Sequence, residues 1–392
     1  MERGDASRPE SLGSHLSDRY PLRVHWTDPG HEDKAAAALE AAELAWEVQV
    51  DELGFAEPVL PDSHDGPELD IYLADLDPWE GWAWAPVQED FQEGDGRMGA
   101  PAYVAFDRDV PDEWLASYVA HEFNHVLQYA TDFTEEAVTP WEATATAAQR
   151  WTLDDGGQWD FDVPDFQVVP WAPTLVGDSY ELWDRFGVDG YYEYGAALWV
   201  VALDEAYGDG SGSMGAWLWD AAAQEGDDTE PDFVDAVAEL AGSLAEAMNV
   251  IAEARWATDP RPPHQTVASL PAVVVPETPV LVLGQLFVQV LADVDPADLV
   301  VDVVSDNGYE LAVTLLQDDA GPVIAVTNLG PVGWDGDDDP WSAAGLELTL
   351  DRTVPDEEPP DGTACSCSAD ESRSASLPLV LATLLLARRR TS

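Results

Sequence analysis

The chain has 392 residues, which allows a substantial buried core and room for two domains with flanking tails. Its formal net charge is −62, from 78 acidic and 16 basic residues, and such a surface repels nucleic acid and anionic lipid, which argues against nucleic acid as a partner. Only two cysteines are present, Cys365 and Cys367 near the C-terminus, which excludes a disulfide framework and a thiolate metal site from the globular part.

The N-terminal part of the chain predicts alternating strands and helices. Residues 1–19 are polar and lack an apolar segment, so we expect a disordered stretch with no visible signal peptide. The alternation over 20–26 predicts a first strand, and the alanine-rich stretch 32–53 predicts a helix that ends at Gly54. This order of elements indicates an α+β fold. Two further strands are expected at 69–74 and 102–106, with a tryptophan-rich loop at 79–86 between them.

The last of these strands leads into an H-E-x-x-H pattern, on a predicted helix that begins near Pro111. Residues four positions apart lie on one face of a helix, so His121 and His125 can point at the same ion. Glu122 lies beside them, where it can take a proton from a water held by that ion. The alternative is a chance pattern on a buried helix. Apolar residues at helical spacing predict a core face roughly opposite the two histidines, formed by Leu115, Val119, Phe123 and Val126.

A second helix is predicted over 140–151, and its start offers a third metal ligand in Glu142. Zinc in hydrolases usually has three protein ligands and one water. The same segment fits a capping box, with Thr139 as N-cap and Glu142 reaching back to it, so Glu142 also has a structural interpretation. A metzincin-type site is excluded, because Gln128 and Thr131 occupy the positions of its glycine and third histidine. The alternative third ligands lie in the loop between the helices: Asp132, Glu135 and Glu136.

A tyrosine-rich segment at 190–199 starts another predicted helix, which runs to about Gly208. One of Tyr191, Tyr192 and Tyr194 could donate a hydrogen bond to the oxyanion that develops when water attacks a carbonyl group. The alternative is an aromatic cluster at a helix start. Two further helices are expected, near 213–223 and over 231–257.

Beyond a proline-rich linker at 260–264 the pattern changes to short β-rich runs, which predict a small β-sandwich domain at 268–352. Its loop at 335–340 spaces aspartates like a calcium loop, but Pro340 and Leu346 stand where an EF-hand needs glycine and an acidic residue. We therefore expect a solvated acidic turn there. Two explanations of the acidic composition are open. One is solubility, and the alternative is calcium binding at aspartate clusters. The expected strands are 272–275, 280–290, 299–304, 311–316, 323–326 and 346–350.

The C-terminal end combines an acidic, proline-rich linker at 353–364 with a tail at 365–392. The tail contains Cys365 and Cys367, an apolar run at 377–387 and three arginines after it. The apolar run is too short for a comfortable membrane span, which takes ~20 residues. We therefore expect a surface-sorting or anchor tail that is removed or lipid-modified, the alternative being a weak transmembrane anchor.

The residues around the H-E-x-x-H pattern resemble the gluzincin-type metallopeptidases of bacterial surfaces. The likeness lies in Ala120–Gln128 and the W-E-x-x-A-like segment Trp141–Ala145, and the segment 194–208 is similar to the downstream helix of that group. There the glutamate of the second segment completes the zinc site, which implies Glu142. The C-terminal tail is similar to the MYXO-CTERM sorting tail of myxobacterial exported proteins. That resemblance implies export and attachment at the cell surface, so we expect the reading frame to extend upstream of Met1 into a signal peptide.

Together these features predict an α+β fold with a zincin-like metallopeptidase domain at 20–259, followed by the small all-β sandwich domain. The predicted function is zinc-dependent hydrolysis of peptide bonds in a peptide or protein substrate, with the oligomeric state left open. We also expect the strand near Tyr103 to be an edge strand to which an extended substrate can pair. The expected site residues are His121, His125 and Glu142 on zinc, Glu122 as general base and Tyr194 as catalytic hydrogen-bond donor.

The alternative function belongs to another class: a non-catalytic surface adhesin or binding module with a structural or degenerate zinc site. Glu122 argues against it, because a purely structural site needs no base beside its ligands. In either case, contact with a membrane is expected only through the C-terminal tail.

Overall fold

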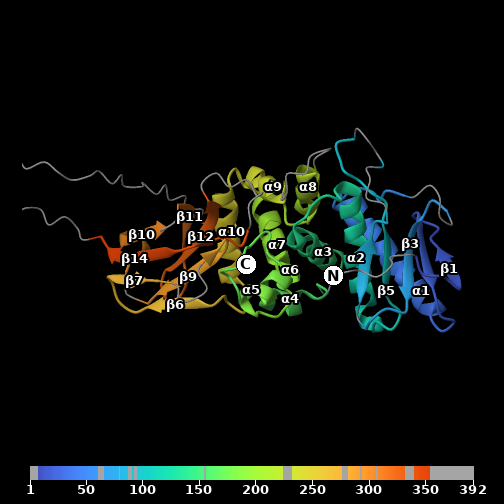
Figure 1. Ribbon diagram of the computed structural model, residues 1–392, viewed down its shortest axis with the longest axis horizontal. Helices are drawn as coiled ribbons and strands as arrows, with labels where there is room; N and C mark the ends of the chain where they lie inside the picture. Colours follow the sequence, from blue (N-terminus) through green and yellow to red (C-terminus); the bar gives the residue numbers. More distant parts are fainter. Residues whose placement is uncertain are drawn as a thin grey trace, which may run out of the picture. The chain divides into compact units, whose positions relative to one another are not determined.

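The computed structural model describes most of the chain up to Thr353. Contacts divide the chain into a unit from Met1 to Thr353 and a unit from Val354 to Ser392. The described part contains both helices and sheets, which confirms the predicted α+β class (Figure 1). The aspartate-rich turn at 335–339 and the tail with Cys365 and Cys367 lie outside the described residues. The described residues are 8–60, 66–78, 80–86, 91, 95–153, 156–223, 232–275, 281–291, 294–305, 308–331 and 340–353.

A five-stranded mixed sheet forms the N-terminal part of the described chain, in the order β1-β2-β3-β5-β4. The three central strands are parallel, and the two edge strands pair antiparallel with their neighbours. The central strands are the three that the sequence predicts. The five strands are β1 (Gly13–Leu16), β2 (Leu22–Trp26), β3 (Leu69–Ala74), β4 (Gly81–Trp84) and β5 (Tyr103–Asp107).

Two strands of this sheet are unexpected, and both lie at its edges. β1 lies inside the segment 1–19, for which the sequence predicts disorder, and β4 lies inside the predicted tryptophan-rich loop. Each has only 4 residues and pairs with one strand of the described sheet, so neither carries enough alternation to be recognised in a sequence. The expectation that the strand near Tyr103 is an edge strand is wrong, because β5 lies between β3 and β4.

The first helix packs on this sheet and on the next helix through small residues. α1 (Glu32–Ala45) buries alanine side chains, among them Ala38 and Ala42, which lets its backbone approach its neighbours closely. It continues as a π-helical turn over Trp46–Glu52 and ends at Gly54, whose φ of 84° favours glycine. The helix predicted over 32–53 and its end at Gly54 are confirmed. The sequence does not predict that its last part is π-helical.

Two helices carry the expected base and the three expected metal ligands. α2 (Asp112–Thr131) begins directly after Pro111 and has acidic residues in its first turn, as the sequence predicts. α3 (Val138–Thr152) packs against it. The predicted core face of α2 is confirmed, because its four members are buried in the main hydrophobic core: Leu115, Val119, Phe123 and Val126.

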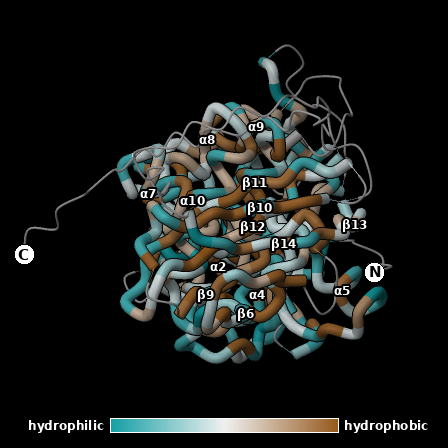
Figure 2. The backbone as a smooth tube through the Cα atoms, turned by 90° about the vertical axis from the view of Figure 1, so that its left-hand side faces the viewer, coloured by the Kyte–Doolittle hydropathy of each residue, from teal (hydrophilic) through white to brown (hydrophobic). Residues whose placement is uncertain are grey.

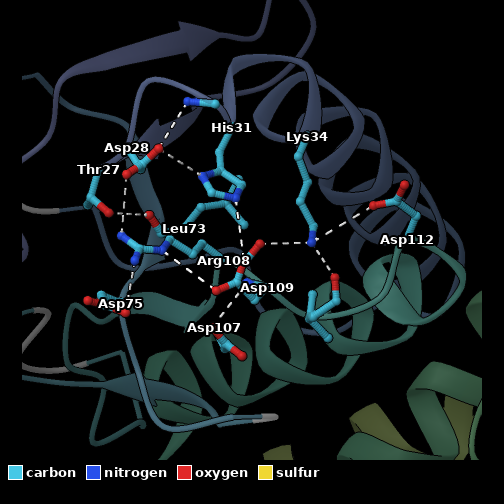
Figure 3. Close-up of polar contacts among 12 residues, drawn as sticks. Thr27, Asp28, His31, Lys34, Leu73, Asp75, Asp107, Arg108, Asp109 and Asp112 are labelled. Carbon is cyan, nitrogen blue, oxygen red and sulfur yellow. Dashed lines mark hydrogen bonds and ion pairs between the residues drawn. The ribbon is translucent and has the colours of Figure 1, made fainter.

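A lysine on α1 holds the turn from which α2 begins (Figure 3). Lys34 Nζ donates hydrogen bonds to the backbone oxygens of Arg108, at 2.8 Å, and of Val110. Lys34 also lies 3.8 Å from the Asp112 carboxylate, and the Arg108 guanidinium pairs with Asp75 at 3.1 Å. Lys34 is the only lysine in the chain, and its side chain is 14% exposed. These contacts tie α1 to the start of the helix with the H-E-x-x-H pattern.

Replacing Lys34 with methionine should lower the free energy of unfolding by about 1–3 kcal/mol, because two backbone carbonyl groups lose a charged donor. Urea unfolding followed by tryptophan fluorescence measures the change. The control is Arg19→Met, since the Arg19 side chain is 52% exposed and solvent screens its ion pair with Glu47, so this variant should unfold at nearly the wild-type urea concentration. Equal stability of the Lys34 variant and the wild type would contradict the anchoring role.

The helices after α3 follow the sequence prediction only in part. Those expected at 190–208 and 213–223 are confirmed as α6 with α7 and as α8, whereas α4 and α5 lie where we predict no element. The single helix expected over 231–257 is two helices, because Gly242 with a φ of 84° interrupts it and the Ser243 hydroxyl caps the second. Among the described residues, no helix combines the length and the apolarity that crossing a membrane requires. The helices are α4 (Trp159–Gln167), α5 (Ser179–Phe186), α6 (Tyr192–Gly195), α7 (Ala197–Tyr207), α8 (Ser213–Ala222), α9 (Asp232–Ala241) and α10 (Leu244–Ala257).

The described strands after α10 form two main sheets, ordered β10-β14-β7 and β11-β12-β9-β6, and a short pair, β13-β8. One hydrophobic cluster contains side chains of both main sheets, including Val288 from one and Leu348 from the other. Apolar residues, in brown, run along β10, β11 and β12 in Figure 2. A second cluster joins the larger sheet to α10 through Trp256. The strands are β6 (His264–Val267), β7 (Ala272–Val274), β8 (Leu281–Val282), β9 (Gln285–Val290), β10 (Leu299–Ser305), β11 (Tyr309–Leu316), β12 (Val323–Pro331), β13 (Ala343–Ala344) and β14 (Leu346–Arg352).

Candidate metal centre

Two helices bring three donor atoms together. α2 presents His121 and His125 from successive turns, and α3 presents Glu142 from near its start. The Nε2 atoms of the two histidines are 3.1 Å apart. Glu142 Oε2 lies 3.1 Å from His121 Nε2 and 3.3 Å from His125 Nε2. Within the described part of the chain, these three residues form the group that could hold a metal ion.

The spacing of the three atoms suits a small tetrahedral ion. Zinc bound to histidine nitrogen and carboxylate oxygen at about 2.0–2.2 Å would place its ligand atoms roughly 3.3–3.5 Å from one another. The observed separations of 3.1 to 3.3 Å are close to that range. Two imidazoles and one carboxylate fit zinc, whereas calcium takes about 6–8 oxygen ligands. Three protein donors also leave a fourth position open, as in catalytic rather than structural zinc sites.

Glu142 does not act as a capping residue. α3 begins at Val138, with Ala137 as its N-cap. Thr139 therefore lies inside the helix, and its hydroxyl donates a hydrogen bond to the Gly177 carbonyl oxygen. The capping-box interpretation is wrong, because the helix starts before the residue that this motif needs as its N-cap, and the Glu142 carboxylate faces the histidines instead.

The alternative third ligands, in the loop after α2, have other positions. Asp132 Oδ1 accepts hydrogen bonds from the Thr134 backbone at 2.9 Å and hydroxyl at 2.6 Å. Glu135 Oε1 accepts one from the Ala137 N–H at 2.8 Å, and Glu136 is exposed. None of these three carboxylates belongs to the group that could hold the metal among the described residues.

Burial and charge shift the pKa values of two candidate ligands, His125 and Glu142, in opposite directions. Burial lowers the pKa of His125, but attraction to the Glu142 carboxylate and the hydrogen bond with it outweigh burial and raise this pKa to about 9. Burial raises the pKa of Glu142, but the charges and hydrogen bonds of His125 and His121 hold it well below its usual range. A carboxylate that stays ionised between two imidazoles suits a divalent cation, which displaces protons from its ligands.

A hydrogen-bond network behind His125 sets the orientation of its ring. His125 Nδ1 lies 2.6 Å from Gln128 Oε1. Gln128 Nε2 donates to Asn124 Oδ1 and to the Trp141 carbonyl oxygen, both at 2.9 Å. Because Gln128 uses its amide hydrogens there, its oxygen accepts a hydrogen bond from His125 Nδ1–H. The lone pair of His125 Nε2 is thereby directed to the candidate metal position.

The network continues into the π-helical turn that follows α1. Gln49 is fully buried, and its Oε1 accepts a hydrogen bond from Asn124 Nδ2 at 3.1 Å. Gln49 Nε2 donates to the Ala120 carbonyl oxygen at 2.9 Å and to Thr152 Oγ1 at 3.1 Å. Gln49 therefore joins the π-helical turn to α2 and α3 behind the ligands. The sequence-based prediction misses Gln49, Asn124 and the role of Gln128. The signal that could have revealed them is an uncharged amide among the apolar residues of a core helix.

Replacing Gln128 with methionine should weaken zinc binding by about 10–100-fold, because His125 loses the acceptor that orients its ring. Competition with a chromophoric chelator measures the zinc affinity. Gln149→Met serves as the comparison, since this buried glutamine on α3 donates its amide hydrogen bond to Ser117 rather than contacting a histidine. Equal zinc affinities of both variants would show that Gln128 does not orient His125.

The candidate metal position adjoins a cleft of about 550 Å³. Its wall includes His121 and Glu122 from α2 and Gly81 from β4. Gly81 permits the close approach of β4 to α2, because a β-carbon there would lie 3.0 Å from Glu122 Oε1 and 3.3 Å from Tyr118. The expected base, Glu122, thus lines the same cleft as the expected ligand His121.

Two of the three candidate tyrosines lie at the cleft. Tyr191 and Tyr194 line it, and the Tyr194 ring stacks on His121 with centroids 5.5 Å apart. Tyr192 is buried elsewhere, with its hydroxyl donating to the Pro173 carbonyl oxygen at 2.8 Å. Burial, with the charges of nearby carboxylates, raises the pKa of Tyr194 well above its usual value. Its hydroxyl therefore stays protonated and able to donate a hydrogen bond.

Comparisons with known proteins do not identify a reaction or a ligand for this site. No protein-family model matches the sequence, and no curated protein matches it at a significant level. The geometry itself combines three donors that could hold a metal ion with a cleft whose wall includes one of them, His121, together with the Glu122 carboxylate and the Tyr194 phenol.

Proposed function

We propose that this chain is a zinc-dependent peptidase that hydrolyses peptide bonds in peptide or protein substrates. The observation that carries the proposal is the convergence of the His121, His125 and Glu142 donor atoms beside a cleft that Glu122 also lines. A structural zinc site is usually closed by four protein ligands. Three ligands, an open position and a neighbouring carboxylate are the parts that metal-assisted hydrolysis uses.

In this mechanism the residues of the chain hold the reactants and move one proton. A zinc ion on the three ligands would polarise the scissile carbonyl group and make the attacking water more acidic. The Glu122 carboxylate accepts a proton from that water as the water oxygen bonds to the carbonyl carbon. It delivers the proton to the amine nitrogen as the carbon–nitrogen bond breaks. The Tyr194 hydroxyl donates a hydrogen bond to the oxyanion.

The edge strand β4 supports an extended substrate conformation. Among the described strands it pairs only with β5, and Gly81 at its start lines the cleft next to Glu122. A peptide that adds to this edge would carry its backbone past the proposed base, with main-chain hydrogen bonds providing affinity.

The domain arrangement and the cellular location belong to the same proposal. We assign residues 20–259 to a zincin-like domain of gluzincin type, because its third ligand is a glutamate on a second helix. The β-sandwich domain at 268–352 follows it. Export and attachment at the cell surface through the tail at 365–392 are proposed from the resemblance of that sequence alone.

A protease assay on a mixture of denatured proteins tests the function. The expected result is cleavage that a chelator abolishes and added zinc restores. Absence of cleavage by the zinc-loaded chain would favour the other class of function, a non-catalytic surface binding module with a structural zinc site.

A further inference from the structure

A buried carboxylate oxygen without a hydrogen-bond partner lies beside the candidate metal centre. Asp162 on α4 is 7% exposed and lines the same cleft as His121 and Glu122. Its Oδ2 atom has no hydrogen-bond partner among the residues that the structure describes. Burying such an oxygen without a partner costs free energy, so a polar or positively charged group from outside the chain would stabilise it.

Close packing of two helices puts Asp162 there. A β-carbon at Gly195, in α6, would lie 2.1 Å from the Asp162 carbonyl oxygen, so glycine is required for this contact. The preceding residue, Tyr194, stacks on His121. Asp162 is therefore held in the cleft by backbone packing and not by a hydrogen bond to its Oδ2 atom.

The other carboxylates near Asp162 already have partners. Asp165 accepts a hydrogen bond from the Tyr191 N–H at 2.7 Å, and Glu193 accepts one from a serine hydroxyl at 2.8 Å. Glu142 faces the histidines. Burial, together with the negative charges of these three residues, raises the pKa of Asp162 to about 7. The described residues that line the cleft include no lysine or arginine to offset this charge.

Aromatic rings line the same cleft as the Asp162 carboxylate. Trp114 and Phe161 meet edge to face with ring centroids 5.7 Å apart, and Tyr118 and Tyr191 also line the cleft. Ring faces attract cations, and a long basic side chain can lay its stem on an aromatic surface while its charged end pairs with a carboxylate. An apolar ligand would leave Asp162 unpaired, and an anionic ligand would be repelled. The cleft is therefore suited to a positive charge.

We infer that Asp162 forms a cation-binding subsite of the cleft, which takes an ammonium or guanidinium group of the substrate. The identity of that substrate as a peptide rests on the proposed function, whereas the subsite rests on the cleft. A peptide offers this chemistry from two sources: a lysine or arginine side chain, and a free N-terminal amine. The first source would give a preference for basic peptides, and the second would make the protein an aminopeptidase.

Binding of small amides to the full-length chain separates the two sources. N-acetyl-lysinamide compared with N-acetyl-norleucinamide tests the side chain, and glycinamide compared with N-acetylglycinamide tests the N-terminal amine. Titrations followed by NMR need no turnover, and Glu122→Gln in every sample prevents hydrolysis. We expect at least one cationic probe to bind more tightly than its neutral counterpart. Asp162→Asn should weaken that probe by about tenfold or more, as expected for the loss of a hydrogen bond to a charged group.

Asp160→Asn is the matched control, because it removes the same charge from an exposed position on α4 and should leave binding unchanged. The inference is overturned if charged and neutral probes bind equally, or if Asp162→Asn binds the cationic probes as tightly as the parent chain. Asparagine has nearly the shape of aspartate, so we expect the variant to fold. If the variant does not fold, the comparison of charged with neutral probes on the parent chain decides whether the cleft prefers a cation.

Failure of this inference is distinguishable from failure of the proposed function. Probe binding that depends on Asp162, in a chain without chelator-sensitive protease activity, would overturn the peptidase proposal and support the cation subsite. Chelator-sensitive cleavage with no preference for the charged probes would support the peptidase proposal and overturn the subsite.

Discussion

Glu122→Gln should keep zinc bound and the fold intact while it lowers peptide hydrolysis by about 10²–10⁴-fold, the usual contribution of general acid–base catalysis. Glutamine has nearly the shape of glutamate but cannot accept a proton from water at neutral pH. Zinc should stay because Glu122 is not one of the three residues that could hold the metal ion. The measurement is kcat/KM on a fluorogenic peptide, with elemental analysis of zinc in the same samples.

Glu113→Gln provides the control for this substitution, since Glu113 is exposed in the first turn of the same helix and should not affect the rate. Cleavage by Glu122→Gln at the wild-type rate would mean that Glu122 is not the base. Equal inactivity of the zinc-loaded wild type and the variant on every peptide tried would favour a binding module instead.

Removing a zinc ligand should have the largest effect on metal affinity. We expect His125→Ala and Glu142→Gln each to weaken zinc binding by more than the ~10–100-fold that losing an outer hydrogen-bond partner costs. The neutral amide of glutamine is a poor replacement for a carboxylate that lies 3.1 Å from His121 Nε2 and 3.3 Å from His125 Nε2. Zinc titration against a competing chelator measures the affinity, and urea unfolding in the absence of metal checks that the fold is retained.

Glu135→Gln is the comparison for the ligand variants, because Glu135 is a buried glutamate whose carboxylate accepts a hydrogen bond from the Ala137 backbone. Its zinc affinity should match that of the wild type. Unchanged affinity in Glu142→Gln would move the third ligand to Asp132, Glu135 or Glu136. Absence of zinc from the reconstituted wild-type protein, measured by elemental analysis, would end the zinc hypothesis.

The part of the site that lies within one helix could be predicted from the sequence. The positions of His121, Glu122 and His125 relative to one another follow from helical spacing, a local property that needs no knowledge of distant residues. The same spacing predicts the core face of α2, which is buried as expected. Glu142 lies on a second helix, so the sequence left open whether it caps that helix or faces the histidines. The position of α3 against α2 decided between the two.

Contacts between residues far apart in the chain decided the rest. The short edge strand β4 exists because β5 pairs with it, and neither its length nor its composition distinguishes it from a loop. The amide network that includes Gln49 joins three helical segments, and Asp162 enters the cleft because Gly195 lets two helices touch. The sequence alone therefore determined which residues could bind a metal and on which helix they lie. Only the tertiary structure decided which carboxylate faces the two histidines, which amides hold His125, and which residues form the walls of the cleft. The reason is that the periodicity within one segment does not encode contacts between segments.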